Sequence, residues 1–217
     1  MSVGRQLRDP LSTAEFKRLP LKAKDLTLTG FWYNLRWEDY AVPDKTFFAS
    51  TTGRLTPDSG SVPCLYLARE RETAFEELYG DFFDAAEKAG TDYNLPLIEA
   101  TKRVFLRTTS PVKLRVYDLT AKGAAKRIGL DLGTLYAPAI EHTRAFAQRL
   151  HDHPARFDGV LYRSRLMNTR CVVTWGSYTT TTPSLEMDSF LKDHFKSNST
   201  IDPDVLLFKR RTTIVGI

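Results

Sequence analysis

The stretch Leu65–Asp81, LYLARERETAFEELYGD, passes from an apolar run into a segment dense in charge. The apolar run, PCLYLA, predicts a strand, because it begins at a proline and ends where charged residues start. From about Glu70 onward, apolar residues recur at alternating steps of three and four, which is the stripe of an amphipathic helix. The members of this stripe are Phe75, Leu78, Phe82, Ala85 and Ala89. A strand followed by a helix that ends at Gly90 is therefore expected here.

The rest of the chain is mostly strand-like in pattern. Strands are expected in TLTGFWYNLRW (27–37), VFLRTTS (104–110), VKLRVYDLT (112–120), RFDGVLYRS (156–164), RCVVTWGS (170–177), DVLLF (204–208) and TTIVGI (212–217). Residues 38–63 are rich in turn formers and predict a loop with one short strand, TFFAS (46–50). A second amphipathic helix is expected in 134–153, with Leu135, Ala139, Phe146 and Leu150 on one side. Short helices are expected before Pro20 and around Met187–Phe195.

This order of elements favours a strand-rich α+β fold with two main helices. It lacks the regular βαβ alternation of a doubly wound parallel sheet. A chain of 217 residues fits one domain, alone or with appendages, and is long enough to bury a core.

The composition is that of a soluble globular protein, with 42% apolar and 26% charged residues. The net charge of +5 favours anionic partners such as phosphates, nucleic acid or an acidic protein surface, without choosing among them. The N-terminus has no apolar core of a signal peptide, and no run approaches the roughly 18 apolar residues of a membrane span. A cytoplasmic protein is expected.

Several kinds of chemistry are disfavoured by the motifs. No GxGxxG, Walker or GxSxG motif occurs. Cys64 and Cys171 lie in strand-like runs and are interpreted as buried thiols of a reducing compartment. The pair His151 and His153 is interpreted as a solvated helix end rather than a metal site, and no metal is expected. The basic run 209–211 is interpreted as a solvated strand edge.

Four glutamates, Glu70, Glu72, Glu76 and Glu77, fall in the opening stretch. Glu77 flanks the apolar stripe and lies one turn after Ala74, whose small side chain leaves space on that helix face. An acidic residue at the edge of a stripe is most often only its boundary. The other three glutamates are interpreted as solvated surface.

Several segments, in this order, resemble the RES domain family, which is named for its Arg, Glu and Ser. They are the GR turn at 53–54, LYLARERETAFEE, YDLT, GTLYAPAIEHTRAFA, FDGVLYRSR and CVVTW. The family pattern has a GRW or GRF turn, a YLA strand, a helix reading AxxE and a late DGxxYxS strand. The resemblance covers about 31–175, so that 1–30 is an N-terminal extension and 176–217 a C-terminal extension that packs on the same domain.

This resemblance implies a single domain with an ADP-ribosyltransferase-like fold that binds NAD⁺ in a cleft between portions of the sheet. RES proteins are typically bacterial toxins, each paired with a helix-turn-helix type antitoxin that covers the active site. Some members cleave the nicotinamide–ribose bond of NAD⁺ with water or phosphate as acceptor, and others transfer ADP-ribose to a protein. Neither a membrane nor nucleic acid is an expected partner.

The resemblance also implies the site residues. Arg54 matches the arginine of the GR turn, Tyr66 the tyrosine of the YLA strand, Glu77 the helix glutamate and Ser164 the serine of the late strand. The family's earlier arginine, on the first strand, matches either Arg36 or the position of Asn34, in which case it is lost. The turn departs from the pattern, since it reads GRLTPDSG.

These positions suit the chemistry of NAD⁺ cleavage. Glu77 is expected to stabilise the positive charge that builds on the ribose and to accept a hydrogen bond from a ribose hydroxyl. Arg54 and Arg36 would bind the pyrophosphate, Tyr66 would stack on the nicotinamide, and Ser164 would orient a ribose hydroxyl or the amide. Glu77, Arg54 and Ser164 are the predicted catalytic residues.

Three functions remain open at this point. The chain is an NAD⁺ glycohydrolase or phosphorylase, an ADP-ribosyltransferase acting on a protein, or an inactive binding module. Its partner is an antitoxin encoded beside it, or an immunity protein if the chain is a delivered effector.

Overall fold

One large curved sheet carries most of the strands. The computed structural model describes residues 11–41, 46–49, 53–91, 93–130, 133, 140–176, 182–194 and 212–215. The strands of the large sheet are β1 (Lys24–Leu28), β2 (Tyr33–Trp37), β3 (Phe48–Ala49), β4 (Pro63–Ala68), β6 (Arg103–Thr108), β7 (Val112–Asp118), β8 (Gly159–Arg163), β9 (Arg170–Trp175) and β10 (Leu185–Phe190). A separate two-stranded sheet contains β5 (Tyr93–Pro96) and β11 (Thr212–Val215).

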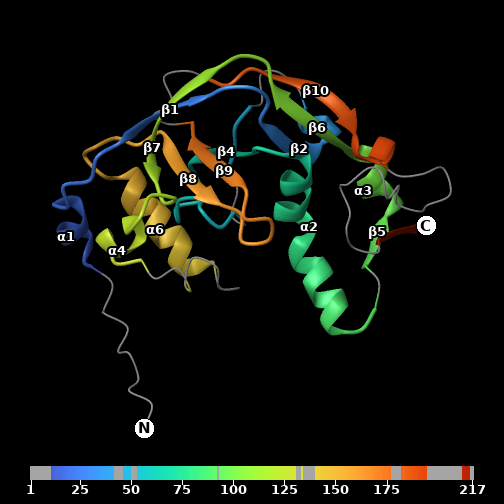
Figure 1. The fold of residues 1–217 in the computed structure, drawn as a ribbon, viewed down its shortest axis with the longest axis horizontal. Coiled ribbons are helices and arrows are strands. Elements are labelled where there is room, and N and C mark those ends of the chain that lie inside the picture. The colour runs from blue at the N-terminus through green and yellow to red at the C-terminus, as the bar shows by residue number, and fades with distance from the viewer. Residues whose placement is uncertain are drawn as a thin grey trace, which may run out of the picture.

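Five α-helices and two short 3₁₀ helices accompany the sheets in the described part of the chain. The α-helices are α1 (Thr13–Lys17), α2 (Arg71–Lys88), α3 (Leu97–Lys102), α4 (Ala124–Arg127) and α6 (Glu141–His151); the 3₁₀ helices are η1 (Glu38–Tyr40) and η2 (Leu191–His194). The two long helices, α2 and α6, lie under the curved sheet (Figure 1). The predicted α+β class with two main helices is confirmed.

The large sheet runs in the order β1-β7-β8-β9-β4-β2-β6-β10, with β3 added beside β4. Its pairs are antiparallel except for β7 with β8. Alternation along β4 sends Leu65 and Leu67 into one hydrophobic cluster and Cys64 and Ala68 into another. The second cluster also contains the buried residues of α1, α2, α4 and α6, so the helices cover one face of the sheet.

The sheet opens between β2 and β4. These two strands are paired only where Tyr33 meets Ala68, whereas β2 stays paired with β6 over five positions. Beyond that point the side-chain amide of Asn34 donates a hydrogen bond of 2.8 Å to the main-chain oxygen of Tyr66. A side chain thus replaces the missing ladder bond, and a gap is left between the two strands.

The helix of the opening stretch forms as predicted, but its buried face differs. Phe75, Tyr79 and Phe83 are at most 3% exposed, and the Phe75 ring contacts the other two in tilted arrangements. Phe82, in contrast, is 55% exposed. The predicted stripe fails because the C-terminal half of α2 extends past the large sheet (Figure 1). Ala85 and Ala89 are exposed there, whereas Phe83 packs on Tyr93 of β5. Gly90 ends the helix in the left-handed conformation with φ +69°, as expected.

A second face of α2 is buried against the β8–β9 hairpin. Thr73 and Thr169 share a hydrogen bond of 2.5 Å between their hydroxyls. Glu76 is 5% exposed, so the interpretation of this glutamate as solvated surface is wrong. Its helix face contacts the hairpin because Gly80, one turn later, lets Leu166 approach closely. Glu70 is exposed and Glu72 is half-buried.

Two other predicted elements are corrected. The expected strand 27–37 is two strands, β1 and β2, because Gly30 takes φ +66° and turns the chain. The Arg69 guanidinium holds that turn by donating to the main-chain oxygens of Thr29 and Phe31. The expected helix around Met187–Phe195 is instead β10 followed by η2, since this segment pairs antiparallel with β6.

Two short predicted elements are present, and several other predictions fall on residues that the structure does not describe. The short helix before Pro20 and the short strand within 46–50 are present as α1 and β3. The predicted strand 204–208, the basic run 209–211 and the positions 135 and 139 of the second helix lie outside the described residues. In the part of the chain that is described, no helix combines the length and apolar character needed to cross a bilayer.

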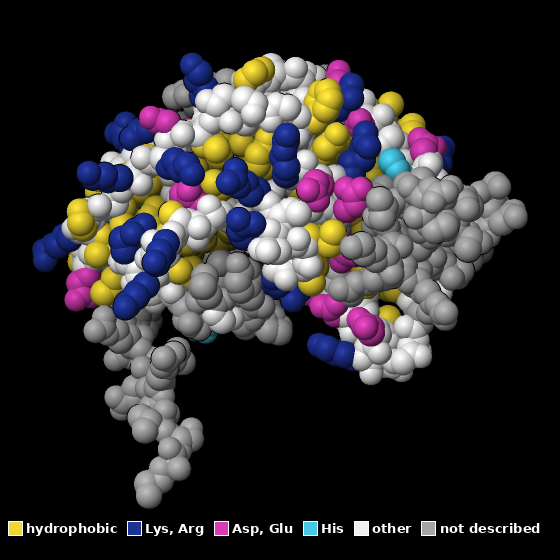
Figure 2. Space-filling view, in the orientation of Figure 1, with side chains coloured by type: hydrophobic (Ala, Val, Ile, Leu, Met, Phe, Trp, Pro, Cys, Tyr) yellow, Lys and Arg dark blue, Asp and Glu magenta, His cyan; other side chains and the backbone are white. Residues whose placement is uncertain are grey.

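Lys and Arg side chains are spread over the face seen in Figure 2, with Asp and Glu side chains between them. In this view the basic side chains are most frequent on the left and in the centre, and the acidic ones lie mostly toward the right.

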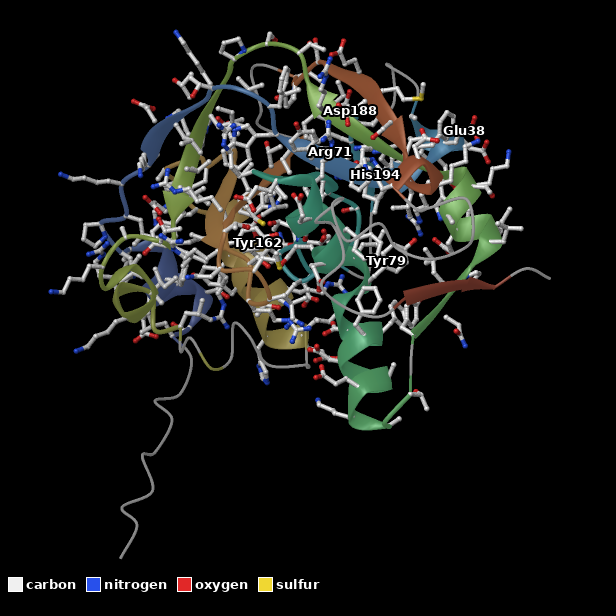
Figure 3. The ribbon with its side chains drawn as sticks, turned by 45° about the vertical axis from the view of Figure 1, so that its right-hand side comes forward. Glu38, Arg71, Tyr79, Tyr162, Asp188 and His194 are labelled. Atoms are coloured by element: carbon white, nitrogen blue, oxygen red, sulfur yellow. The ribbon has the colours of Figure 1, made fainter. Side chains whose placement is uncertain are left out.

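An ion pair joins the first turn of α2 to β10 (Figure 3). The Arg71 guanidinium donates to both carboxylate oxygens of Asp188, at 2.7 and 2.9 Å, and lies 4.9 Å from the Tyr33 ring centre. A cation is unfavourable at a helix N-terminus, so the carboxylate also compensates the helix dipole there. Burial alone would raise the pKa of Asp188, but its hydrogen bonds to Arg71 and Ser189 and the charges of Arg71 and Arg107 bring this pKa below its ordinary value.

Asp188→Asn is therefore expected to destabilise the fold at neutral pH by about 1–2 kcal/mol, a value reduced by the solvent exposure of Arg71. A carboxyl with a lowered pKa in the folded state contributes stability above its unfolded pKa of about 3.9, and this contribution is lost as pH falls below it. Urea unfolding at neutral pH and at pH about 2.5 measures the difference. Asp25→Asn, at an exposed position of β1, is the control. A destabilisation that persists unchanged in acid would contradict this account.

Candidate active site

A cavity of about 890 Å³ lies at the gap between β2 and β4. Residues of β2, β4, α2, the loop before β4 and the β8–β9 hairpin line it. Its volume is in the range of ligand sites. Four of the five predicted site residues, Arg36, Arg54, Tyr66 and Glu77, line this cavity, and Ser164 does not.

Glu77 is exposed toward the cavity from the middle of α2. Its Oε2 accepts a hydrogen bond of 3.2 Å from the hydroxyl of Tyr162, a buried residue of β8. Ala74, one turn earlier, also lines the cavity. Burial and then the charge of Glu77 raise the pKa of the Tyr162 hydroxyl well above its ordinary value, so this hydroxyl remains a donor at physiological pH.

The turn that carries Arg54 is held against Tyr66. The Tyr66 hydroxyl accepts a hydrogen bond of 3.0 Å from the Leu55 amide and shares another of 3.0 Å with the Thr56 hydroxyl. A Cβ at Gly53 would meet this same hydroxyl at 2.5 Å, so glycine is needed for the close approach. Burial raises the pKa of the Tyr66 hydroxyl, and the hydrogen bond with Thr56 lowers it by a smaller amount.

Arg36 lies in the cavity wall beside Asn34. Its Nε donates to the Asn34 side-chain oxygen, and its terminal nitrogens lie 3.4 Å from the main-chain oxygens of Tyr40 and Thr46. Only 8% of Arg36 is exposed, and burial lowers the pKa of Arg36 to about 10, so it remains charged at neutral pH. Arg36 and Asn34, the two candidates for the family's first-strand arginine position, both line the cavity wall. Arg36 also braces the loop before β3.

Two further arginines line the cavity and were not predicted: Arg163 at the end of β8 and Arg165 in the turn after it. Arg165 forms an ion pair with Asp81 of α2. Burial, and next the positive charge of Arg54, lower the pKa of Arg165, while Glu77 acts in the opposite direction. Arg54, Arg165 and Glu77 are thus close enough for their charges to interact. Arg103 from β6 lines the cavity as well.

Ser164 belongs to the turn after β8. Its Oγ accepts hydrogen bonds of 3.2 Å from the main-chain amides of Leu166 and Met167, and the residue is 2% exposed. It borders a smaller hollow together with Asp84, Arg165, Leu166 and Asn168. The hydroxyl therefore shapes the turn that places Arg165 in the main cavity.

A family model for the RES domain matches residues 21–184. The chain belongs to the RES domain family. None of the curated proteins compared with the chain matches it. Among solved structures, a chain of the crystal structure of the M. tuberculosis MbcT–MbcA toxin–antitoxin complex is similar, with TM-score 0.50 and 19% identity. The match covers 77% of this chain and 85% of that chain. This likeness confirms the α+β fold that the resemblance implied.

The RES residues of the late strand have different surroundings in the structure. Tyr162 of the DGxxYxS pattern reaches Glu77, whereas Ser164 bonds its own turn. The sequence signal that could have singled out Tyr162 is its place two residues before Ser164, since alternation puts both on one face of a strand. Arg165 gave no such signal, because it lies in the turn itself.

The aromatic lining of this RES cavity comes from outside the GR turn. Trp37, Tyr40, Phe48 and Phe82 all line it. The Arg103 guanidinium lies 4.5 Å from the Trp37 ring centre, and Tyr40 and Phe48 are 5.1 Å apart by ring centres. These rings come from β2, η1, β3 and α2.

The cysteines and histidines occupy other positions in the RES fold. Cys64 and Cys171 are free, buried thiols, as predicted, and burial raises the pKa of Cys64 to about 11. His151 and His153 are buried, at 9% and 5% exposed, so the interpretation as a solvated helix end is wrong. His153 packs against Phe16 and lies 3.2 Å from the main-chain oxygen of Leu19. Among the described residues, no three His, Cys, Asp or Glu side chains gather as a metal site.

Ser164→Ala is expected to lower stability by about 1 kcal/mol, because two amides of a buried turn lose their acceptor. The melting temperature should fall by about 2–4 °C. Calorimetry measures the effect. An unchanged melting temperature would contradict the role of the Ser164 hydroxyl in holding this turn.

Proposed function

We propose that the chain is a RES-type toxin that cleaves the nicotinamide–ribose bond of NAD⁺, as a glycohydrolase or a phosphorylase, and so depletes NAD⁺ and arrests growth. One observation carries this proposal: Glu77, Arg54, Arg36 and Tyr66 line the same cavity, with the carboxylate exposed to it. Membership of the RES family adds support.

The charges of the cavity suit the substrate. NAD⁺ has two phosphates, and five arginines line the cavity: Arg36, Arg54, Arg103, Arg163 and Arg165. One guanidinium group can donate two parallel hydrogen bonds to the oxygens of one phosphate. Such contacts would hold the pyrophosphate while the ribose reaches Glu77. Cleavage builds positive charge on the ribose, and a carboxylate fixed beside it stabilises that charge in the transition state more than in the ground state.

Tyr66 completes the arrangement for the leaving group. Its hydroxyl is fixed by Leu55 and Thr56, so its ring keeps one orientation in the cavity wall. An aromatic face is attractive to the cationic nicotinamide before cleavage and less so to the neutral product. Neutral nicotinamide would then leave, and water or phosphate would take the ribose.

Purified protein incubated with NAD⁺, with and without phosphate, tests the proposal by following free nicotinamide. Release that depends on phosphate identifies a phosphorylase, and release without it identifies a glycohydrolase. Labelled ADP-ribose on a protein would favour the transferase alternative. Absence of both nicotinamide release and labelling would contradict the proposal. Failure to bind NAD⁺ at millimolar concentration would support the third function, an inactive binding module.

The proposed toxin requires a cognate inhibitor. The similar chain comes from a toxin–antitoxin complex, and the net charge of +5 favours an acidic partner. We infer an antitoxin of the helix-turn-helix type, or an immunity protein if the chain is delivered to another cell. Expression of the chain alone in the cytoplasm should arrest cell growth, and coexpression of the neighbouring gene should relieve this arrest. Arrest that the Glu77→Gln variant reproduces would argue against NAD⁺ cleavage as its cause.

A further inference from the structure

We propose that Tyr162 is a positioning residue, whose buried hydroxyl holds the Glu77 carboxylate in place so that its second oxygen faces the ribose. The proposal rests on the proposed function for its catalytic meaning, and on the Tyr162–Glu77 hydrogen bond for its geometry. It assigns a role to the tyrosine of the DGxxYxS segment, a residue that the predicted site did not include.

Tyr162 is a rigid support. It lies in β8, which is paired on both sides, and it faces Cys171 of β9 in register. Its side chain belongs to the main hydrophobic cluster and only 7% of the residue is exposed. A phenol ring packed in this way has one direction in which to present its hydroxyl.

Glu77, in contrast, is exposed to the cavity and needs such a support. A glutamate on a helix surface has several rotatable bonds and loses conformational entropy when it is fixed. The hydrogen bond from Tyr162 reaches Oε2 at 3.2 Å and leaves Oε1 for a ribose hydroxyl. A catalytic carboxylate that is fixed before the substrate binds has no reorganisation to make during the reaction.

The alternative is that Tyr162 is only part of the core, and Tyr117 shows what that role looks like. Tyr117 is a buried tyrosine of the neighbouring strand β7, and its hydroxyl donates to the main-chain oxygen of Ala124 at 2.8 Å. That hydrogen bond holds α4 to the sheet and does not involve the cavity. The Tyr162 hydroxyl instead reaches an exposed carboxylate on the cavity side of α2. An exposed carboxylate can be solvated by water, so the fold does not require this hydrogen bond.

The first test compares Tyr162→Phe with Tyr117→Phe, since both remove one buried hydroxyl and keep the ring. Tyr162→Phe is expected to lower kcat for nicotinamide release by about tenfold with a KM for NAD⁺ within about twofold of the original, because the substrate still binds but the carboxylate is less well placed. Tyr117→Phe should leave kcat unchanged. In a Glu77→Ala background, Tyr162→Phe should cause no further loss, measured with enzyme in excess over NAD⁺. Equal losses with and without Glu77, or an unchanged kcat, would overturn the proposal.

A second test does not depend on turnover. If the hydroxyl and the carboxylate interact, the decreases in melting temperature of Tyr162→Phe and Glu77→Ala will not add in the double variant. Additive decreases would show that the two groups are independent. If wild-type protein releases no nicotinamide but the decreases are non-additive, the proposed function fails and the contact stands.

Discussion

Glu77→Gln is expected to lower the rate of nicotinamide release from NAD⁺ by about a hundredfold to a thousandfold. The amide keeps the size of the side chain and can still accept a hydrogen bond, but it has no charge to stabilise the developing positive charge of the ribose. The loss should appear in kcat, because the contact strengthens in the transition state. NAD⁺ binding should change little, since the arginines of the cavity remain.

Glu87→Gln is the matched control for this prediction. Glu87 is an exposed glutamate of the same helix, and it lies in the last turn of α2, away from the cavity-lining residues. Its replacement should leave the rate unchanged. Steady-state release of nicotinamide and NAD⁺ binding by calorimetry measure both variants, and a Glu77→Gln variant with the wild-type rate would remove Glu77 from the mechanism. Stability should be similar in both, because neither carboxylate is buried.

Local sequence patterns predicted one strand–helix unit of the site correctly. The strand–helix unit at 63–88 follows from an apolar run, a change to a period of 3.6 and a glycine at the end, all of which are local signals. This unit alone brings Tyr66 and Glu77 to the same cavity, and Gly53 brings Arg54 to Tyr66. The part of the site that depends on one connected segment could therefore be predicted from the sequence and its family resemblance.

Features that depend on distant segments could not be predicted in this way. Glu76 is buried only because the β8–β9 hairpin packs against α2, and the helical period does not contain that contact. The segment around Met187 has a pattern compatible with a helix, and its pairing with β6, about 80 residues earlier, decides in favour of a strand. Tyr162 and Arg165 join the site for the same reason, since β8 reaches α2 only in the folded chain.

Within DGVLYRS (158–164), the residue that the family motif singles out is not the residue that reaches Glu77. The sequence suggests one functional residue at its end, Ser164. The structure divides the segment into a start that joins strands, a middle residue that reaches Glu77, and a turn that carries Arg165.

Gly159→Ala is expected to destabilise the protein by at least about 3 kcal/mol. A Cβ at this position would collide with the main-chain oxygen of Val173 and meet the Thr174 Cα at 2.8 Å. Both atoms belong to the backbone of β9, which is paired with β8 along its length, so they cannot move away without disturbing the centre of the sheet. The residue before it strengthens the constraint: Asp158 exchanges hydrogen bonds with the Arg115 backbone and accepts one of 2.7 Å from the Trp175 amide.

The measurement is urea unfolding, or the melting temperature, which should fall by at least about 6 °C. Gly176→Ala is the control, because the three atoms nearest to a Cβ there all belong to the side chain of Phe47, the nearest at 3.2 Å. A side chain can move by a few tenths of an ångström. Its cost should stay below about 1 kcal/mol. Since β8 carries Tyr162 toward Glu77, any Gly159→Ala protein that still folds should also release nicotinamide more slowly than Gly176→Ala. A Gly159→Ala protein with wild-type stability would mean that β8 and β9 can separate, and the rigid support assigned to Tyr162 would then be lost with them.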